Sequence, residues 1–119
     1  MVISYFEESV VSVNWNKDSS LLASADLSGL IKVWSIKEKK CMIEFEEEEI
    51  EFVTFHPLHA KYLLAAQTDG NCYFYSCSDG NFKILPGGGV KVVAAEFLGD
   101  KGSELLVLYE DSTLRVFRY

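Results

Sequence analysis

The side chains in this sequence best suited to chemistry are two histidines and three cysteines. His56 and His59 lie in the segment FHPLHA, where a proline indicates a turn, and no third or fourth ligand lies near them. Cys72 and Cys77 are five residues apart, so on an extended strand their side chains point to opposite faces, unlike a CxxC pair. We therefore predict loop histidines, reduced thiols and no metal site.

The remaining motifs do not assemble into a catalytic set. The run Gly87-Gly88-Gly89 lacks the spacing and the following helix of a phosphate loop, and it is predicted to be a flexible connection. Serines and aspartates are concentrated in turn-like segments, where they form local hydrogen bonds. No nucleophile, base and orienting acid can be combined. The sequence predicts a protein that is not an enzyme and needs no cofactor.

Acidic side chains suggest a different chemistry, the binding of cations. The formal net charge is −7, and residues 46–49 of FEEEEIEF are four consecutive glutamates. Nucleic acids and anionic membranes are bound largely through lysine and arginine, so both are disfavoured as partners. A basic protein segment is favoured. The tract by itself is compatible with a helix, a disordered segment or a loop.

Bulk properties indicate one small domain covering residues 1–119. Hydrophobic residues make up 49% of the chain, which is enough to form a core. No apolar run is long enough to cross a bilayer, and the N-terminus lacks the pattern of a secretory signal. With reduced thiols, these features predict a cytoplasmic protein, with the nucleus as an additional location.

The elements that position the acids are revealed by internal repetition. Three segments align: SVNWNKDSSLLASADLSGLIKVW, EFVTFHPLHAKYLLAAQTDGNCYFY and AAEFLGDKGSELLVLYEDSTLRVF. In each copy the first aromatic anchor is Trp15, Phe55 or Phe97, and the second is Trp34, Tyr75 or Phe117. A short turn precedes the second anchor in each copy, at Ser28-Gly29, Asp69-Gly70 or Asp111-Ser112.

Each copy is predicted to consist of short strands. After the first turn, Ile31 and Val33 alternate with Leu30, Lys32 and Trp34, and this period of two indicates β-structure. The apolar runs beginning at Leu21 and Leu105 suit inner strands that are buried on both faces. Outer strands complete four strands per unit and are predicted at Val2–Phe6, Cys41–Phe45 and Phe82–Leu85. No helix is expected.

A period of about 40 residues with four strands and a small-residue turn before an aromatic is typical of a WD40-type β-propeller blade. The segment LLASADLSGLIKVW resembles the WD40 consensus, and the other two copies are degenerate. The hydrogen-bonded set of well-formed WD40 repeats is incomplete, leaving Ser24 and Trp34 in one copy and Asp69 and Asp111 in the others. The predicted fold is all-β, with three four-stranded repeats (1–36, 41–77 and 82–119) forming an incomplete ring.

A closer resemblance rests on four segments in this order: DLSGLIKVW, FHP, LLAAQTDGN and LLVLYEDSTLRVF. Together they are similar to the angio-associated migratory cell protein family from Val10 to Tyr119, over three internal repeats of a normally complete ring. Phe or Tyr stands at several positions where that family tends to have Trp. The resemblance implies a binding module that, like fungal members of the family, holds a basic segment of a ribosomal protein before assembly.

An incomplete ring leaves two possibilities open. The chain is completed by further WD40 repeats or by a partner, or copies associate head to tail, in which case two chains would make six blades. Both require that the isolated chain is not a stable monomer. Whether Met1 is the native start is left open by the sequence.

Loop order in a blade assigns the acids to one face of the disc. The loop that connects the outer strand to the innermost strand, and the turn that precedes the second aromatic anchor, lie on what we call the top face, and the other loops lie on the bottom face. Ten of the eighteen acids fall on the top face: Glu7, Glu8, Asp26, Glu46, Glu47, Glu48, Glu49, Asp69, Glu110 and Asp111. Six of the eleven bases fall on the bottom face, Lys17, Lys37, Lys39, Lys40, Lys61 and Lys101, against four acids there, Asp18, Glu38, Asp79 and Asp100.

Two functions follow from this arrangement. In the first, the acidic top face binds a basic peptide or ribosomal protein segment, because clustered carboxylates attract and orient a cationic partner. In the second, the chain is a structural subunit that completes a larger propeller. The simplest alternative reading of the charges is that the loops are merely polar and solvated.

Overall fold

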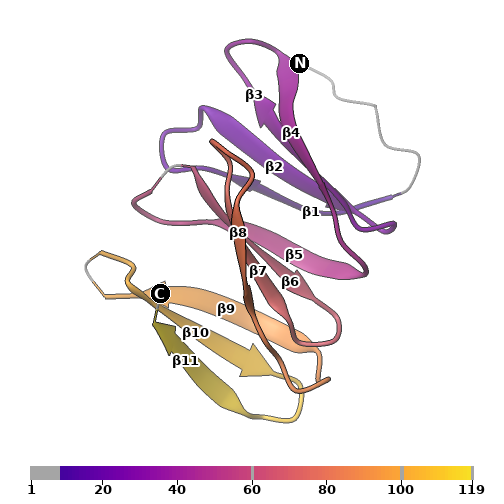
Figure 1. Cartoon of the computed structure of the whole chain (residues 1–119), viewed down its shortest axis with the longest axis vertical. Coiled ribbons are helices and arrows are strands. Elements are labelled where there is room, and N and C mark those ends of the chain that lie inside the picture. Colours follow the sequence, from indigo (N-terminus) through magenta and orange to yellow (C-terminus); the bar gives the residue numbers. More distant parts are fainter. Residues whose placement is uncertain (1–8, 60, 100, 119) are drawn as a thin grey trace.

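The chain folds into three antiparallel sheets that are stacked side by side (Figure 1), as described by a computed structural model for residues 9–59, 61–99 and 101–118. The first sheet has the order β1-β2-β3-β4: β1 (Val10–Trp15), β2 (Leu21–Asp26), β3 (Leu30–Ser35) and β4 (Lys40–Glu46). The second has the order β5-β6-β7-β8: β5 (Ile50–Phe55), β6 (Tyr62–Gln67), β7 (Cys72–Ser76) and β8 (Phe82–Leu85). The third consists of β9 (Val92–Leu98), β10 (Glu104–Tyr109) and β11 (Leu114–Arg118).

The all-β prediction is confirmed, and the described part of the chain contains only strands, turns and loops. It therefore has no helix long and apolar enough to cross a membrane. The first two sheets have four strands and the third has three in the described residues, as predicted if the first strand of each sequence unit completes the preceding blade. The predicted outer strand Val2–Phe6 lies outside the described residues. Each four-stranded sheet takes its outer strand from the start of the next sequence unit, so β4 belongs to the unit 41–77.

Strand register repeats from sheet to sheet. In the first sheet, Leu22 of the middle strand β2 lies opposite both Trp15 and Trp34. The corresponding middle-strand residues lie opposite the other two pairs of anchors: Leu63 with Phe55 and Tyr75, and Leu105 with Phe97 and Phe117. The aromatic anchors found by sequence alignment therefore form one cross-strand row in every sheet, which we call the anchor row.

Each anchor row of the second and third sheets packs against the preceding sheet. Phe55, Leu63 and Tyr75 share a core with small and branched residues of β2 and β3, including Ala23 and Val33. Leu105 lies in a second core with residues from β6 and β7, and Phe97 and Phe117 pack against that core. The core thus consists of two apolar layers between three sheets, as expected when the inner strands are buried on both faces.

The anchor row of the first sheet has no such neighbour among the described residues. Trp15 is 51% exposed, although it occupies the same register position as the buried Phe55. Trp34 is buried, and its indole N–H donates to the Ser24 hydroxyl at 3.2 Å, so the Ser–Trp pair predicted from the repeat is formed. In the first anchor row, Trp15 is therefore exposed to solvent, whereas Trp34 is covered.

Two buried tyrosines near the top face differ in the hydrogen bonding of their hydroxyl groups. The Tyr75 hydroxyl donates to the Glu47 carboxylate at 2.6 Å, which ties the second sheet to the loop between β4 and β5. The buried Tyr109 hydroxyl has no hydrogen-bond partner in the described part of the chain, and the Arg115 guanidinium lies over its ring at 5.2 Å. Tyr75 thus links two segments by a hydrogen bond, whereas Tyr109 contributes mainly apolar contact.

A buried histidine links the second and third sheets at the bottom face. His56 Nδ1 accepts hydrogen bonds from the main-chain amides of Leu58 and His59, at 3.1 and 3.0 Å. Nδ1 is therefore unprotonated, and Nε2 donates to the Gly102 carbonyl at 2.9 Å. The prediction of two loop histidines is correct for the exposed His59 but misses this tie, which spans 46 residues of sequence.

Tyr75 and Tyr109 give a matched pair of hydroxyl deletions. We expect Tyr75→Phe to lower the free energy of unfolding by about 1–2 kcal/mol, because it removes a hydrogen bond to a charged group. We expect Tyr109→Phe to change it by less than about 0.5 kcal/mol or to raise it, because no hydrogen bond is lost. Urea unfolding followed by circular dichroism measures both values. Equal destabilisation by the two substitutions would contradict these hydrogen-bond assignments.

The His56 tie makes stability sensitive to pH. Burial lowers the pKa of His56 from its ordinary value of 6.5, because protonation would displace two amide donors in a desolvated site. The unfolded chain then binds more protons than the folded chain as the pH falls through about 6.5, so stability falls with it, by at most ~1.4 kcal/mol per pH unit. This contribution is fully present above that pH.

A titration of the imidazole resonances by NMR, combined with unfolding measurements from about pH 7.5 to about pH 5.5, tests this prediction. His56→Gln should reduce the loss of stability on acidification, whereas the matched variant His59→Gln should retain it. A His56 resonance that titrates at or above its ordinary pKa would show that the histidine is not held in the neutral form.

Candidate protein-binding face

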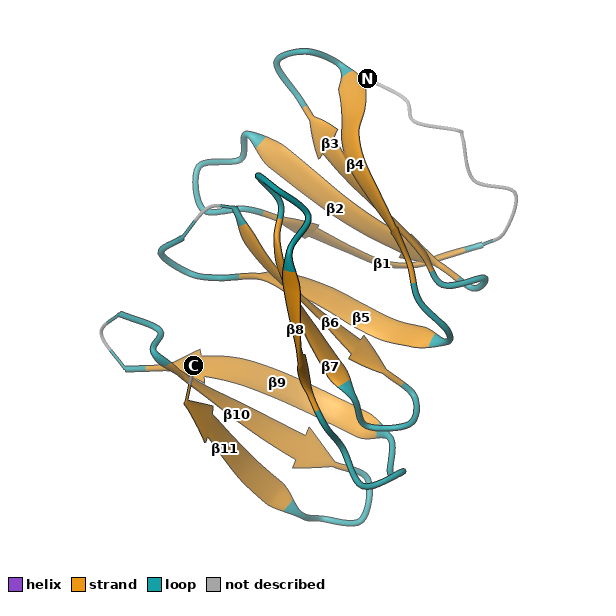
Figure 2. Cartoon of the chain, viewed as in Figure 1, coloured by secondary structure: helices purple, strands orange, loops and turns teal. Residues whose placement is uncertain are grey.

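The strand directions of the three sheets place alternate loops on one side of the molecule. In Figure 2 the loops β2–β3, β4–β5, β6–β7, β8–β9 and β10–β11 lie along the right-hand ends of the strands. Main-chain hydrogen bonds connect neighbouring loops: Glu47 N to Gly29 O, Thr68 N to Glu49 O and Glu110 N to Lys91 O, all at 2.9 Å. These loops form the top face inferred from the sequence, and they are a connected layer.

A recess of about 800 Å³ lies on the top face between the first and second sheets. Among the described residues, the charged ones that line it are all acidic: Glu46, Glu47, Glu48 and Asp69. The other lining residues are mainly polar or aromatic, and they are Ser28, Leu30, Gln67, Asn71 and Tyr73. The recess therefore combines negative charge with amide and hydroxyl groups, a lining suited to ammonium or guanidinium groups.

The glutamate loop is held at several points. Glu46 is the last residue of β4 and pairs with Leu30, so the predicted four-residue loop is corrected to Glu47–Glu49. Gln67 donates its side-chain amide to the Glu48 carbonyl at 2.9 Å. Thr68 donates both its main-chain amide and its hydroxyl to the Glu49 carbonyl. The carboxylates are therefore displayed from a fixed backbone, at a low entropic cost of binding.

Gly29 fixes the loop from the other side. Its φ of 89° lies in the left-handed region, and a Cβ at this position would overlap the carbonyl group of Glu47. The aligned positions of the other two copies, Gly70 and Ser112, also have positive φ, of 95° and 69°. The turn position identified in the sequence is thus a conserved backbone geometry within this chain, and glycine is required where the glutamate loop approaches.

Glu47 affects the ionisation of two tyrosines: Tyr73, which lines the recess, and Tyr75, which donates a hydrogen bond to Glu47. Burial raises the pKa of both Tyr73 and Tyr75, and the adjacent negative charge of Glu47 raises each further. The two phenols therefore remain protonated, and Tyr75 stays a hydrogen-bond donor to the Glu47 carboxylate. Glu47 is consequently a structural member of the recess, while Glu46, Glu48 and Asp69 are exposed.

The structure distributes the predicted acids unevenly. Asp26 is buried and accepts hydrogen bonds from Ser28 and from the Leu30 amide, so it shapes a turn and is not available at the surface. Glu110 and Asp111 lie apart from the recess, in the β10–β11 loop of the third sheet. Hydrogen bonds from Thr113 lower the pKa of Asp111. Glu7 and Glu8 lie outside the described residues.

Two cations also reach the top face. Lys91, anticipated from the sequence, forms an ion pair with Glu51 at 3.5 Å. Arg115 lies on β11, and its Nη1 donates to the Pro86 carbonyl of the β8–β9 loop at 3.3 Å. The sequence does not place Arg115 on the top face, because loop order assigns only loop residues to that face. Both cations lie toward the third sheet. The negative part of the top face is therefore the recess between the first two sheets.

The remaining sequence motifs have structural roles. Cys72 lies in the core between the second and third sheets and Cys77 in the core between the first and second, so the predicted opposite orientation is confirmed. Burial raises the pKa of these thiols to about 12 and about 11. The predicted flexible glycine run is wrong at Gly87, which is packed against the Gly70 backbone and donates to Asn71 Oδ1 at 2.8 Å.

Comparisons with known proteins agree with this architecture. A family model described as "WD domain, G-beta repeat" matches residues 2–35. Angio-associated migratory cell protein from Homo sapiens, Pongo abelii and Canis lupus familiaris is in each case 34% identical over 111 residues. The match covers 93% of this chain, which spans 25% of the length of each relative.

A solved structure supports the fold independently. The β-propeller domain of Cps50 (Swd1) from Myceliophteria thermophila superposes with a TM-score of 0.85 over 98% of this chain and 40% of that chain, at 15% identity. The three stacked sheets thus correspond to consecutive blades. This chain therefore carries a WD40 repeat, folds as blades of a β-propeller, and is similar over most of its length to angio-associated migratory cell protein.

Proposed function

We propose that the chain is a non-catalytic protein-binding module that holds a basic protein segment on its top face. The β-propeller fold is in general a protein-interaction scaffold. The observation that carries the finer proposal is the recess of about 800 Å³ in which every charged lining residue is acidic. A lysine- or arginine-rich segment in this recess would replace solvent around three exposed carboxylates with charge-assisted hydrogen bonds.

The similarity to angio-associated migratory cell protein extends this proposal to a class of partner. The family resemblance implies a basic segment of a ribosomal protein, protected before its assembly in the cytoplasm or nucleus. Ribosomal proteins must neutralise RNA phosphates, so their extensions are rich in lysine and arginine. An acidic recess with a fixed backbone would supply a temporary counter-charge for such a segment.

A second candidate function is that of a structural subunit completed by further blades or by a second copy. The specific observation in its favour is Trp15 of the first anchor row, which is exposed at the position of the buried Phe55. Covering this row would bury apolar surface, so such an association should persist at high salt. Binding of a basic segment should instead weaken as salt rises.

Charge-neutralising variants distinguish binding at the top face from attraction by the net negative charge of the whole chain. We expect the triple variant Glu46→Gln, Glu48→Gln and Asp69→Asn to weaken binding of a fluorescein-labelled Lys-Gly repeat peptide about tenfold, because three carboxylates are lost. The matched variant Asp18→Asn, Glu38→Gln and Asp79→Asn removes the same charge from the bottom face and should change binding less than about twofold.

Fluorescence anisotropy at about 50 and about 200 mM salt provides these affinities. Glu47 is left unchanged because it is bonded to Tyr75. Equal effects of the two triple variants would remove the support for a top-face site. Sedimentation velocity on the same samples tests the second candidate, which predicts association that is insensitive to salt and to both triple variants.

A further inference from the structure

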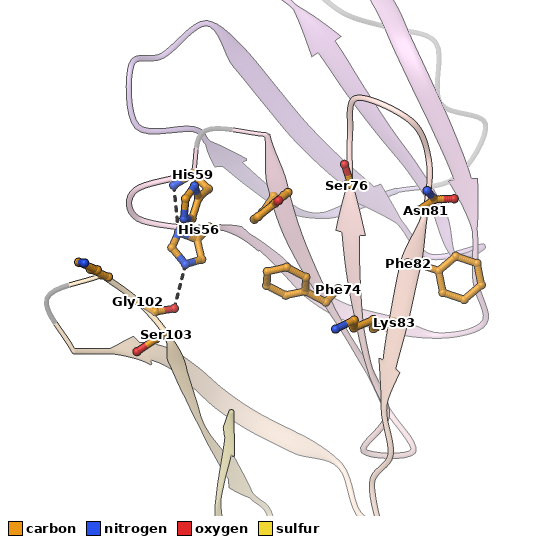
Figure 3. Close-up of a pocket in the computed structure, with 11 residues that line it drawn as sticks. His56, His59, Phe74, Ser76, Asn81, Phe82, Lys83, Gly102 and Ser103 are labelled. Atoms are coloured by element: carbon orange, nitrogen blue, oxygen red, sulfur yellow. Dashed lines mark hydrogen bonds between the residues drawn. The ribbon is translucent and has the colours of Figure 1, made fainter. Parts of the chain in front are cut away.

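A second recess, of about 510 Å³, lies on the bottom face between the second and third sheets (Figure 3). It is bordered by the β5–β6 loop, the ends of β6, β7 and β8, and the β9–β10 loop. The His56–Gly102 hydrogen bond closes one side of it. This recess is separate from the acidic top face, and nothing in the proposed function uses it.

One wall of the recess is aromatic. The rings of Tyr62 and Phe74 meet edge to face, with centroids 5.5 Å apart, and the His59 ring lies 5.2 Å from Tyr62. His56 contacts the same cluster from the interior, with its centroid 6.5 Å from that of Phe74. Tyr62 is 38% exposed, so the wall offers apolar surface. Its interlocked rings form a pre-organised site for a bulky apolar group.

The charges around this wall are cationic. Lys83 lies beside Phe74 as its cross-strand neighbour. Lys101, in the β9–β10 loop, also lines the recess. Both lysines are exposed, and neither is within ion-pair distance of a carboxylate of the described residues. No acidic residue is among the described residues that line the recess. Its charge is therefore opposite to that of the top-face recess.

We infer that the bottom-face recess binds a short acidic protein segment that inserts a bulky apolar side chain against Tyr62 and Phe74. Carboxylates flanking that side chain would pair with Lys83 and Lys101. The apolar group supplies the buried anchor, and the ion pairs orient the segment. The molecule then has two faces of opposite preference, a basic segment on the top face and an acidic one on the bottom face.

A nucleic acid is also negatively charged, but it is a less favourable ligand for the bottom-face recess than an acidic peptide. Two lysines offer few phosphate contacts, and the chain has a formal net charge of −7, which repels a long polyanion. A short peptide carries its negative charge only where the lysines are. The recess is also bordered by an apolar wall that takes one side chain, which suits a peptide anchor.

Charge reversal tests whether Lys83 and Lys101 contribute to the binding of an acidic segment. The probe is a labelled peptide of about six residues in which Leu-Phe is flanked by Asp and Glu, measured by fluorescence anisotropy up to about 1 mM. We expect the double variant Lys83→Glu and Lys101→Glu to weaken binding about tenfold or more. The matched variant Lys17→Glu and Lys37→Glu changes bottom-face charge in the first sheet and should alter affinity less than about twofold.

The aromatic half is tested by Tyr62→Ser, with Leu58→Ser as the control, because both residues are exposed apolar side chains of the bottom face and only Tyr62 lines the recess. We expect loss of binding in the first variant and none in the second, with thermal melts establishing that both are folded. The inference is overturned if wild-type protein does not bind the peptide, or if both lysine pairs matter equally. It is also overturned if an oligo-dT strand binds more tightly than the peptide.

Discussion

The packing of the second and third anchor rows against the preceding sheet is the interaction on which the rest of this structure depends. Each row joins three strands through a fixed register, and its apolar side chains fill the layer between two sheets. A single four-stranded sheet has two apolar faces and cannot bury both, so neighbouring sheets are required for stability. The same requirement explains why the first sheet, whose row includes the exposed Trp15, has the character of an internal blade.

The placement of alternate loops, and of their charges, on two opposite faces follows from this packing. When equivalent rows stack, strand directions in successive sheets are aligned and alternate loops fall on opposite faces. Hydrogen bonds reinforce the alignment at the inner edge, where Ser12 and Asn14 of β1 contact the main chain of β5 at Val53 and Phe55. Acids of the top-face loops thereby line one recess, and Lys83 of β8 and Lys101 of the β9–β10 loop line the other, so the two recesses differ in charge. Neither recess lies within one sheet, so both depend on the contact between sheets.

Most of the fold could be predicted from the sequence because it rests on local periodicity. Alternation predicted the strands, with β8 at its observed bounds, and the 40-residue period predicted the common register. Less could be predicted of the site, because its details depend on contacts between repeats. One buried position, at the end of the strand before the top-face turn, is occupied by Asp26, Gln67 and Tyr109 in the three copies. Because these side chains are dissimilar, the sequence did not indicate that the position is equivalent. The His56–Gly102 bond and the reach of Arg115 likewise join segments far apart in the chain.

The central claim is that a basic segment binds the top face at the junction of the first two sheets. An amide chemical-shift map of the labelled chain, recorded during titration with a Lys-Gly repeat peptide at low salt, tests it directly. The account predicts that the shifts concentrate at Gly29, at Glu47–Glu49 and in the β6–β7 loop, and that they vanish as salt is raised. Shifts centred on the bottom-face loops, or spread evenly over the chain, would contradict it.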